Sequence, residues 1–360
     1  MIVVVLWTIT LMTILVAVIA SQTRLSAEVA WIHKQDLALW AAQQSAINQA
    51  EMELMMENMP LPAKQQQEKM DNSAASLNET QKNPRYRYNG QSIDLAYKQN
   101  DNIEVRIFEH GGKINLREIN AARMRALLEK KLGGAGKANQ EQLDNLMDAW
   151  SDWLDLNDGK NPRGAEKDYY LALDTPFIPR NGALETVEEI LNVRGFADVL
   201  GDVDLDAAFT LYGEDELVNL NTATVEAMRL LPGLNEELIG KIVAWRKDHE
   251  FQGNGDVAQL LPAENMTELR PWISIRKTTN YYTIMVTTRP ENVASDQPPP
   301  ETKESDIPQE DEDRHTFRTA FAEIVYASSA SERPQVLKIN PYQKLPIDPD
   351  TLIPPEGSTQ

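Results

Sequence analysis

The chain has 360 residues, with 55 acidic and 35 basic side chains and a formal net charge of −20 at pH 7. This charge argues against a protein that coats nucleic acid or anionic lipid, because both of those partners are negative themselves. The sequence contains no cysteine, which excludes disulfides, thiolate metal sites and cysteine nucleophiles. Its length and hydrophobic content of 42% are sufficient for at least two cores besides an apolar N-terminal segment.

Residues 1–23 are apolar and uncharged, and the segment ends at Arg24. A helix of this length rises about 35 Å, enough to cross a hydrocarbon core of about 30 Å. We expect a retained transmembrane helix rather than a cleaved secretory signal, because no Lys or Arg precedes a run that is also longer than a signal core. Two interpretations of the start stay open: a basic leader has been removed before Met1, or Met1 is the true start.

Residues 24–58 are predicted to continue the same helix, because they contain neither Gly nor Pro. Apolar residues recur every seven positions along two neighbouring lines, formed by Leu25, Ile32 and Leu39 and by Trp40, Ile47 and Leu54. The opposite side is polar, so the segment is amphipathic. The pattern favours one helix of about 55 residues that begins in lipid and ends as the spine of a soluble domain. A coiled-coil stalk is the alternative.

Strand patterns occur in two separate parts of the chain, residues 59–112 and residues 274–340. The first part has candidates at 86–88, 93–97 and 103–108, and the second at 278–288, 315–326 and 336–339. These runs are rich in β-branched and aromatic residues, and several alternate apolar with polar positions. A long helix followed by antiparallel strands indicates an α+β fold.

Two further segments of the C-terminal part have compositions that do not favour a packed core. Residues 291–313 are strongly acidic and contain several prolines, which predicts a disordered loop between two strands. Residues 341–360 are also rich in proline, and we expect them to form an extended tail.

Residues 113–273 have the pattern of short helices, predicted at 120–132, 140–154, 186–192, 222–231 and 236–249. A weak repeat relates two parts of this region at an offset of 104 residues. Ile114, Asn115, Leu116 and Met124 recur as Val218, Asn219, Leu220 and Met228. The sequence therefore predicts an inserted α-helical domain that contains two related units.

Residues 218–246 resemble a helix-hairpin-helix module, in which amides at a helix N-terminus grip a DNA phosphate. Asn221 or Thr222 is positioned to cap the first helix, and Pro232-Gly233 makes the link to the second. The Gly that usually follows the hairpin is replaced by Asn235, and two glutamates come next. Because these carboxylates would repel a phosphate, we favour a structural hairpin over a nucleic-acid clamp.

An acidic stretch at 148–173 supplies several hard oxygen ligands, the kind that Ca²⁺ requires. The candidate ligands are Asp152, Asp155, Asn157, Asp158, Glu166 and Asp168. Their spacing is not that of an EF-hand, and a solvated acidic loop is the alternative interpretation.

No catalytic constellation emerges, since the four histidines are scattered and no hydrolase or phosphate-loop motif occurs in context. We therefore expect a protein that is not an enzyme.

In their order along the chain, five segments resemble the minor pseudopilin K family of type II secretion, also called general secretion pathway protein K. They are VVVLWTITLMTILVAVIASQTR at the N-terminus, GGKINL at 111–116, WSDWLDLNDGKNPRGAEKDYY at 150–170, RNGALETVEEILNVRGF at 180–196 and VNLNTATVEAMRLLPGL at 218–234. The third resembles the family's W-x-D-x-D and GAE-x-x-YY stretch. The combination is specific, although each segment alone is not.

The resemblance implies a pilin-like fold, in which a long N-terminal helix packs on a small antiparallel sheet and a large helical domain is inserted in the sheet region. It implies that a prepilin peptidase removes a leader and that the new N-terminus, Met1, is methylated. Pilins usually carry a glutamate at the fifth mature position, whereas this chain has Val5, as K-type proteins tend to do. A carboxylate without a partner is costly in lipid, so its loss fits a subunit with no neighbour above it.

The same resemblance implies a structural subunit that caps the tip of a periplasmic pseudopilus together with I- and J-type minor pseudopilins and so supports protein export. The chain would be a single-pass protein of the bacterial inner membrane with its bulk in the periplasm. Its helix, including Val5, Leu6, Trp7, Leu11 and Leu15, would lie in lipid before assembly and in the filament afterwards. Calcium binding is also implied. The alternative is a membrane-tethered nucleic-acid-binding protein of the DNA-uptake type.

Overall fold

The structure is a computed structural model that describes residues 2–57, 88–93, 95, 103–134, 136–275, 279–288, 319–329 and 331–352. Several predictions fall outside these residues. They concern Met1, most of the strand candidates at 86–88 and 93–97, the acidic loop at 291–313, and residues 353–360.

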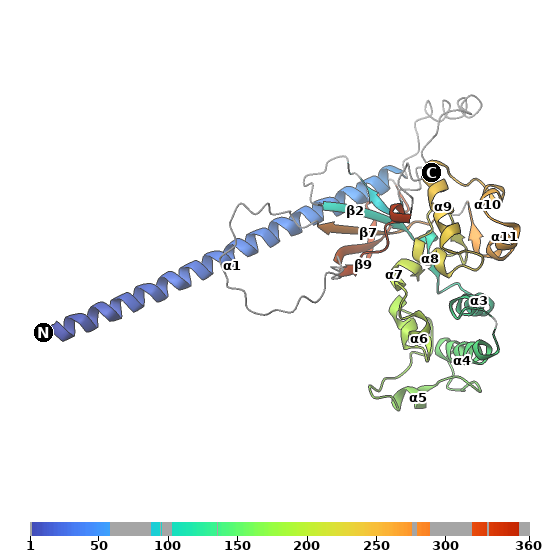
Figure 1. Cartoon of the computed structure of the whole chain (residues 1–360), viewed down its shortest axis with the longest axis horizontal. Coiled ribbons are helices and arrows are strands. Elements are labelled where there is room, and N and C mark those ends of the chain that lie inside the picture. Colours follow the sequence, from blue (N-terminus) through green and yellow to red (C-terminus); the bar gives the residue numbers. More distant parts are fainter. Residues whose placement is uncertain are drawn as a thin grey trace, which may run out of the picture.

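A single helix, α1 (Ile2–Glu57), accounts for the whole N-terminal region, as the sequence predicts. Its N-terminal part projects away from the rest of the molecule, and its C-terminal part lies along the sheet (Figure 1). Ala46, Ile47, Ala50 and Leu54 are buried there against sheet residues that include Ile107 and Ile284. The helix therefore enters the core that it shares with the sheet only with its last turns.

The sheet has five antiparallel strands in the order β1-β2-β7-β8-β9. The strands are β1 (Asn89–Ile93), β2 (Ile103–Glu109), β7 (Tyr281–Thr288), β8 (Thr319–Tyr326) and β9 (Gln335–Lys344). In the central pair, Ile107 lies opposite Ile284 and Val105 opposite Val286, and these four side chains face α1. Because side chains alternate along a strand, Phe108 and Met285 belong to a separate cluster. The α+β prediction is confirmed.

The chain between β2 and β7 forms a region that we call the helical insert, residues 110–280. Its helices lie beyond the end of the sheet, away from the N-terminal part of α1 (Figure 1). Its elements are η2 (His110–Gly112), β3 (Ile114–Asn115), α3 (Ala121–Lys131), α4 (Lys137–Leu154), α5 (Lys167–Leu171), η3 (Val187–Asn192), α6 (Phe196–Leu200), α7 (Leu205–Ala208), β4 (Phe209–Thr210), β5 (Val218–Asn219), α8 (Val225–Leu230), α9 (Glu236–Asp248), α10 (Asn254–Leu260), α11 (Ala263–Leu269), η4 (Arg270–Trp272) and β6 (Ile273–Ser274).

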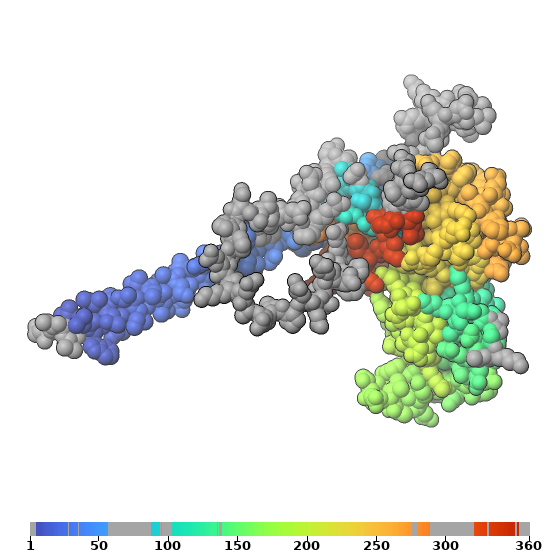
Figure 2. Space-filling view, in the orientation of Figure 1, coloured from blue at the N-terminus to red at the C-terminus, as the bar shows by residue number. Residues whose placement is uncertain are grey.

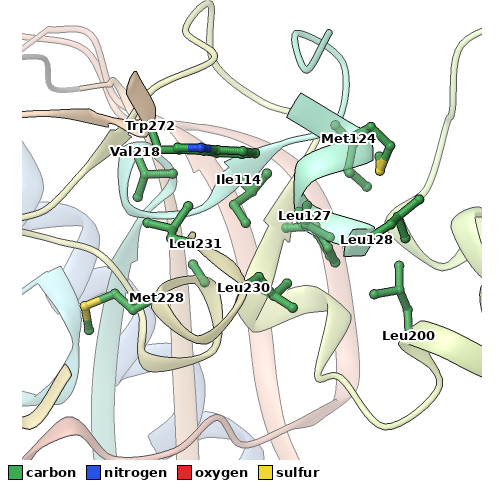
Figure 3. Close-up of a cluster of buried hydrophobic side chains, with 14 of the residues drawn as sticks. Ile114, Met124, Leu127, Leu128, Leu200, Val218, Met228, Leu230, Leu231 and Trp272 are labelled. Carbon is green, nitrogen blue, oxygen red and sulfur yellow. The ribbon is translucent and has the colours of Figure 1, made fainter. Parts of the chain in front are cut away.

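The two units related by the repeat have the same local build. In each unit a two-residue strand makes a short parallel pair, β3 with β4 and β5 with β6, and a helix follows, α3 or α8. Figure 3 shows equivalent positions of both units in one hydrophobic cluster, including the pairs Ile114 and Val218, Met124 and Met228, and Leu127 and Leu231. The repeat thus builds the central part of the insert's core.

The C-terminal segment differs from the predicted extended tail. Residues 341–344 belong to β9, and η5 (Pro349–Leu352) follows. Between them, the backbone N–H of Ile347 donates to Glu226 Oε1 at 2.8 Å, and Asp348 pairs with Arg106 at 3.0 Å. Figure 2 shows these C-terminal residues, in red, against the yellow part of the helical insert. The segment therefore connects the sheet to the insert, through partners that are distant in sequence.

Candidate functional site

The first half of α1 exposes its apolar side chains. Those predicted to lie in lipid are all more than half exposed: Val5 55%, Leu6 58%, Trp7 69%, Leu11 59% and Leu15 56%. Among the described residues, α1 is the one helix that is long and apolar enough to cross a membrane. Apolar surface of this extent requires cover from lipid or from other apolar helices.

Three threonine side chains within this apolar stretch bond to the helix itself. The hydroxyls of Thr8, Thr10 and Thr13 donate to the carbonyls of Val5, Leu6 and Ile9, each at 2.8 Å. In a hydrocarbon environment an unsatisfied polar group costs several kcal/mol. These internal bonds remove that cost, so the threonines are compatible with a helix in lipid.

The amphipathic continuation is buried over a shorter length than the sequence predicts. On the first predicted line, Leu25 is 62% exposed, Ile32 50% and Leu39 39%. On the second line, Trp40 is 56% exposed, whereas Ile47 and Leu54 are buried. The sheet covers only the last turns of α1. An apolar stripe between residues 25 and 40 therefore remains open to a partner.

The acidic stretch lies where α4 ends and α5 begins, on the part of the helical insert farthest from the sheet (Figure 1). Asp152 is fully buried in the last turns of α4. Its Oδ1 accepts the backbone N–H of Asn161 at 3.1 Å and the Asn161 side-chain amide at 2.6 Å. A Cβ at Gly164 would collide with Asp152 Oδ2. Asp152 thus holds the loop against α4.

The amide of Asn181 organises the oxygen atoms of the loop. Its Nδ2 donates to the carbonyl of Asn157 at 3.1 Å, to Asp158 Oδ1 at 3.3 Å and to Glu166 Oε2 at 3.4 Å. Asn181 has a positive φ of 47°, and the next N–H, that of Gly182, donates to the carbonyl of Trp153 at 3.0 Å. One amide group thus lies at the centre of three oxygen ligands.

Two buried oxygens of this cluster have no hydrogen-bond partner among the described residues. They are Glu166 Oε1 and Asn181 Oδ1. Burial raises the pKa of Glu166; the Asn181 hydrogen bond opposes this rise, and the charges of Asp152, Asp155 and Asp158 add to it. The cluster is therefore an incompletely satisfied, electronegative environment, which is the condition that a cation would relieve.

The remaining predicted ligands lie apart from this cluster or bond locally. Asp155 caps α4 and accepts the backbone N–H of Asn157 at 3.1 Å, and the Asn157 side chain accepts the N–H of Gly159 at 2.6 Å. Asp168 is exposed in the first turn of α5. Within the described ranges, no three His, Asp or Glu side chains form a group that could hold a metal ion. The structure thus brings Asp158, Glu166 and the Asn157 carbonyl to one amide, and it gives Asp152, Asp155 and Asp168 other contacts or positions.

The hairpin at 218–246 forms two helices, and side chains of the same chain bond to the start of α9 and to the link between the helices. Asn235 caps α9, with its Oδ1 accepting the N–H of Leu238 at 2.9 Å, and Glu236 pairs with Arg229 at 2.7 Å. Lys130 Nζ donates to the carbonyl of Leu231 and, at 2.9 Å, to that of Leu234. These contacts favour the structural hairpin.

The cap of the first hairpin helix differs from the prediction. Thr224, rather than Asn221 or Thr222, begins α8 by accepting the N–H of Ala227 at 3.2 Å. Asn221 is instead buried and bonds to the backbone of Phe251, accepting its N–H at 2.9 Å and donating to its carbonyl at 3.1 Å. Asn221 therefore links the segment that precedes α8 to the segment that follows α9.

Sequence reasoning did not identify Asn161, Asn181 or Lys130 as important for these sites. A signal existed for Asn181, since Asn-Gly dipeptides mark turns and asparagine tolerates a positive φ. Asn161 bonds to a residue 9 positions away, and Lys130 bonds to residues 101 and 104 positions away. A local sequence pattern contains no information about these partners.

Comparison with known proteins gives a match within the helical insert. Residues 111–200 match the family described as type II secretion system (T2SS), protein K. The resemblance to protein K predicted from the sequence is confirmed over these residues. No curated protein matches the chain significantly.

Among solved structures, the chain is similar to a chain in the crystal structure of the GspK-GspI-GspJ complex from the type 2 secretion system of enterotoxigenic Escherichia coli. That similarity has a TM-score of 0.43 and 13% identity, and covers 70% of this chain and 82% of that chain.

Proposed function

We propose that this chain, whose residues 111–200 match the protein K family of type II secretion systems, is a minor pseudopilin of such a system. The observation that carries the proposal is the position of the matched residues. They lie between two neighbouring strands of a sheet that packs on the end of a long apolar helix. A pilin-like subunit with a bulky insert at the end away from the membrane has the shape expected of a filament tip.

The mechanism is interfacial and involves no chemical turnover. The first half of α1 lies in the inner membrane before assembly and among the helices of other pseudopilins afterwards, because both environments cover its exposed apolar side chains. The remainder of the chain lies in the periplasm. The helical insert stands beyond the sheet at the end of the molecule opposite the N-terminus (Figure 1). There it blocks addition of a further subunit and supports export from the tip.

The partners of the proposed subunit are I- and J-type minor pseudopilins. Co-purification of the full chain in detergent with these proteins from the same bacterium tests the proposal. We expect a stable complex with both. Circular dichroism of the isolated chain provides the control, because a folded chain that fails to form the complex would contradict the proposed role.

Processing of the N-terminus is part of the same proposal. A prepilin peptidase would produce Met1 and its amino group would be methylated. Intact-mass spectrometry of the protein purified from its host tests this directly. The expected mass is that of the sequence from Met1 with one added methyl group, and a longer unmethylated chain would contradict it.

Calcium binding at the acidic loop is a further part of the proposed function. The Asn157 carbonyl, Asp158 and Glu166 already point oxygens at one amide group of Asn181. Rotation of that amide would bring Asn181 Oδ1 among them, since the two ends of an amide are nearly equal in shape. Four oxygen donors plus water then match the coordination of Ca²⁺. The ion would neutralise the carboxylates and fix the loop after α4.

Calcium binding is tested by thermal unfolding of the full chain in detergent, with added Ca²⁺ or with a chelator. At a Ca²⁺ concentration of about 100 times Kd, the ion should stabilise the fold by about 2.7 kcal/mol. Asp158→Asn and Glu166→Gln should each remove most of this gain. Asp168→Asn is the matched control, because Asp168 is exposed on α5, and it should retain the gain. Equal loss in all three variants would contradict this choice of ligands.

A further inference from the structure

A groove of about 550 Å³ lies where the sheet meets the helical insert. It is lined by the start of β7, the end of β8, the turn after β2 and the loop after β4. Its lining includes the aromatic residues Tyr212, Tyr281 and Tyr326 and the titratable residues His110, Lys113, Glu214 and Asp215. Its volume is within the range of about 300–1,000 Å³ that is typical of ligand sites. The hairpin and the acidic loop are not part of it.

Three tyrosine rings form one continuous wall of the groove. The ring of Tyr281 lies 5.7 Å from that of Tyr212 and 4.9 Å from that of Tyr326, with interplanar angles of 33° and 49°. The rings are therefore tilted relative to one another, so the wall is curved. All three tyrosines are only partly buried and line the groove.

The charges around the tyrosine wall favour a cation. Glu214 is exposed at the groove and Asp215 also lines it. Behind the wall, His110 is buried, and its two ring nitrogens lie 2.6 Å and 2.8 Å from the hydroxyls of Thr210 and Thr283. Burial lowers the pKa of His110 well below its usual value, and the charge of Lys113 adds to this, so the imidazole is neutral at pH 7.

Lys113 is the one described cation that lines the groove, and its ammonium is engaged elsewhere. Its Nζ donates to the carbonyl of Asp206 at 2.7 Å and lies 5.5 Å from the ring centroid of Phe108. The nearby carboxylates of Asp206 and Asp204 act on the same ammonium. The groove thus combines aromatic faces, carboxylates and hydroxyls. The ammonium of its one described lysine is bound to the Asp206 carbonyl.

We infer that this groove binds the guanidinium group of an arginine side chain on another protein. A guanidinium stacks on aromatic faces, and its fork of N–H donors matches carboxylate and hydroxyl oxygens. A chain with a net charge of −20 also attracts basic partners over a distance. The choice of a guanidinium concerns the groove alone, whereas the argument below against a lipid headgroup rests on the proposed membrane position of α1.

A quaternary ammonium group has similar chemistry, and lipid headgroups are its common source at a membrane. The position of the groove argues against that source. Tyr281 is adjacent to Tyr282, which packs in the same core as Leu54 near the end of α1. At 1.5 Å per residue, the helix from Arg24 to Leu54 is about 45 Å long. The groove is therefore far beyond the headgroups of the membrane that holds α1.

The test measures binding of small probes to the full chain in detergent by saturation-transfer NMR. The probe is N-acetyl-arginine amide, with N-acetyl-glutamine amide as the neutral analogue and choline as the quaternary ammonium. We expect the arginine probe to bind more tightly than choline, and choline to bind more tightly than the neutral glutamine probe. Glu214→Gln and Tyr326→Leu should each weaken binding about two- to fivefold, the size of one cation–π or exposed charge contact.

Matched controls are Glu264→Gln on α11 and Tyr342→Leu on β9, both at exposed positions outside the groove. They should leave binding unchanged. The inference is overturned if the glutamine probe binds equally well, if choline binds more tightly than the arginine probe, or if the groove variants behave like the controls. Arg276 and Lys277 lie outside the described residues, next to the groove in sequence. Binding seen only after Arg276→Ala and Lys277→Ala would also overturn it, because the chain would then fill its own groove.

Discussion

Large apolar side chains are exposed along the first half of α1, whereas most of those in the helical insert are buried in its core. In α1, Leu6 is 58% exposed and Leu15 56%, whereas Met124, Leu127 and Phe196 of the insert are fully buried. The insert covers its own apolar surface with neighbouring helices from the same chain. The first half of α1 has no such neighbours among the described residues, so its stability depends on lipid or on other subunits.

The helices of the two regions also begin differently. α1 has 56 residues, so the capping of its two ends contributes little to the stability of the whole helix. The helices of the insert are short, and capping side chains begin several of them: Asn120 for α3, Asp204 for α7, Thr224 for α8 and Asn235 for α9. Because short helices are marginal in isolation, the insert depends on local caps and on its core together.

The largest expected effect comes from the core of the insert. Phe196 is fully buried and stacks on Trp150 with ring centroids 5.6 Å apart. Phe196→Ala should lower the free energy of unfolding by about 3–5 kcal/mol, because it removes apolar contacts and leaves a cavity. Urea unfolding of the full chain in detergent, followed by tryptophan fluorescence, measures this. Leu156→Ala is the control: Leu156 is 89% exposed, and a similar loss there would contradict the comparison.

A charge in the first half of α1 should act on membrane insertion and leave the insert folded. Leu15→Lys places an ammonium in the apolar stretch and should disfavour insertion by about 2.5–3.5 kcal/mol. Leu37→Lys is the matched control, since Leu37 is also exposed, at 65%, but lies beyond Arg24. Extraction of membranes with alkaline carbonate should release the first variant and retain the second. Equal release of both would mean that the lipid-facing part extends to residue 37.

The sequence was sufficient for α1, for the longer helices of the insert and for the long strands β2, β7, β8 and β9, because their signals are local, whereas the short helices α5, α6, α7, α10 and α11 were not predicted. The uninterrupted run up to residue 58 predicts α1, and the alternation of Ile103, Val105 and Ile107 predicts β2. The extent of burial along α1 was not predictable in the same way. Leu25 and Ile47 lie on similar apolar lines, yet only Ile47 meets the sheet, because burial depends on where strands from distant parts of the chain are placed.

The acidic loop illustrates the same limit for a candidate site. Its carboxylates were visible in the sequence, but the residue that brings them together, Asn181, comes 15 residues after Glu166. Asp152 appeared equivalent to Asp158, although it is engaged by Asn161 and holds the loop. Composition therefore identifies which residues could bind a cation. Only the fold shows which of their oxygens converge on one point and which stabilise the loop instead.

Stability should respond to alkaline pH through Lys113, a buried residue of the insert whose ammonium lies against Phe108 of the sheet. Burial lowers the pKa of Lys113 from 10.5 to about 8, against the opposing charges of Asp206, Asp204 and Glu226. Between these two values the unfolded chain binds more protons, so stability should rise with pH, by about 1–2 kcal/mol from pH 8 to 9.5. Lys113→Met should lose this rise.

Urea unfolding at several pH values measures the effect of Lys113 as the difference between the wild type and the variant, so that other alkaline titrations cancel. Lys241→Met provides the control, because Lys241 lies on the surface of α9. It should keep the wild-type slope. A wild-type slope in Lys113→Met would show that this lysine does not couple the sheet to the insert.

The smallest expected effect tests the caps of the insert. Asn235 Oδ1 accepts the N–H of Leu238 at the start of α9. Asn235→Ala should cost about 1 kcal/mol, because that N–H loses its partner, whereas Asn235→Gly should cost only a few tenths. Urea unfolding of both variants distinguishes them, and hydrogen exchange at α9 should rise in the alanine variant first. If alanine and glycine were equally tolerated, α9 would depend on its buried residues alone, as the membrane-distal turns of α1 do.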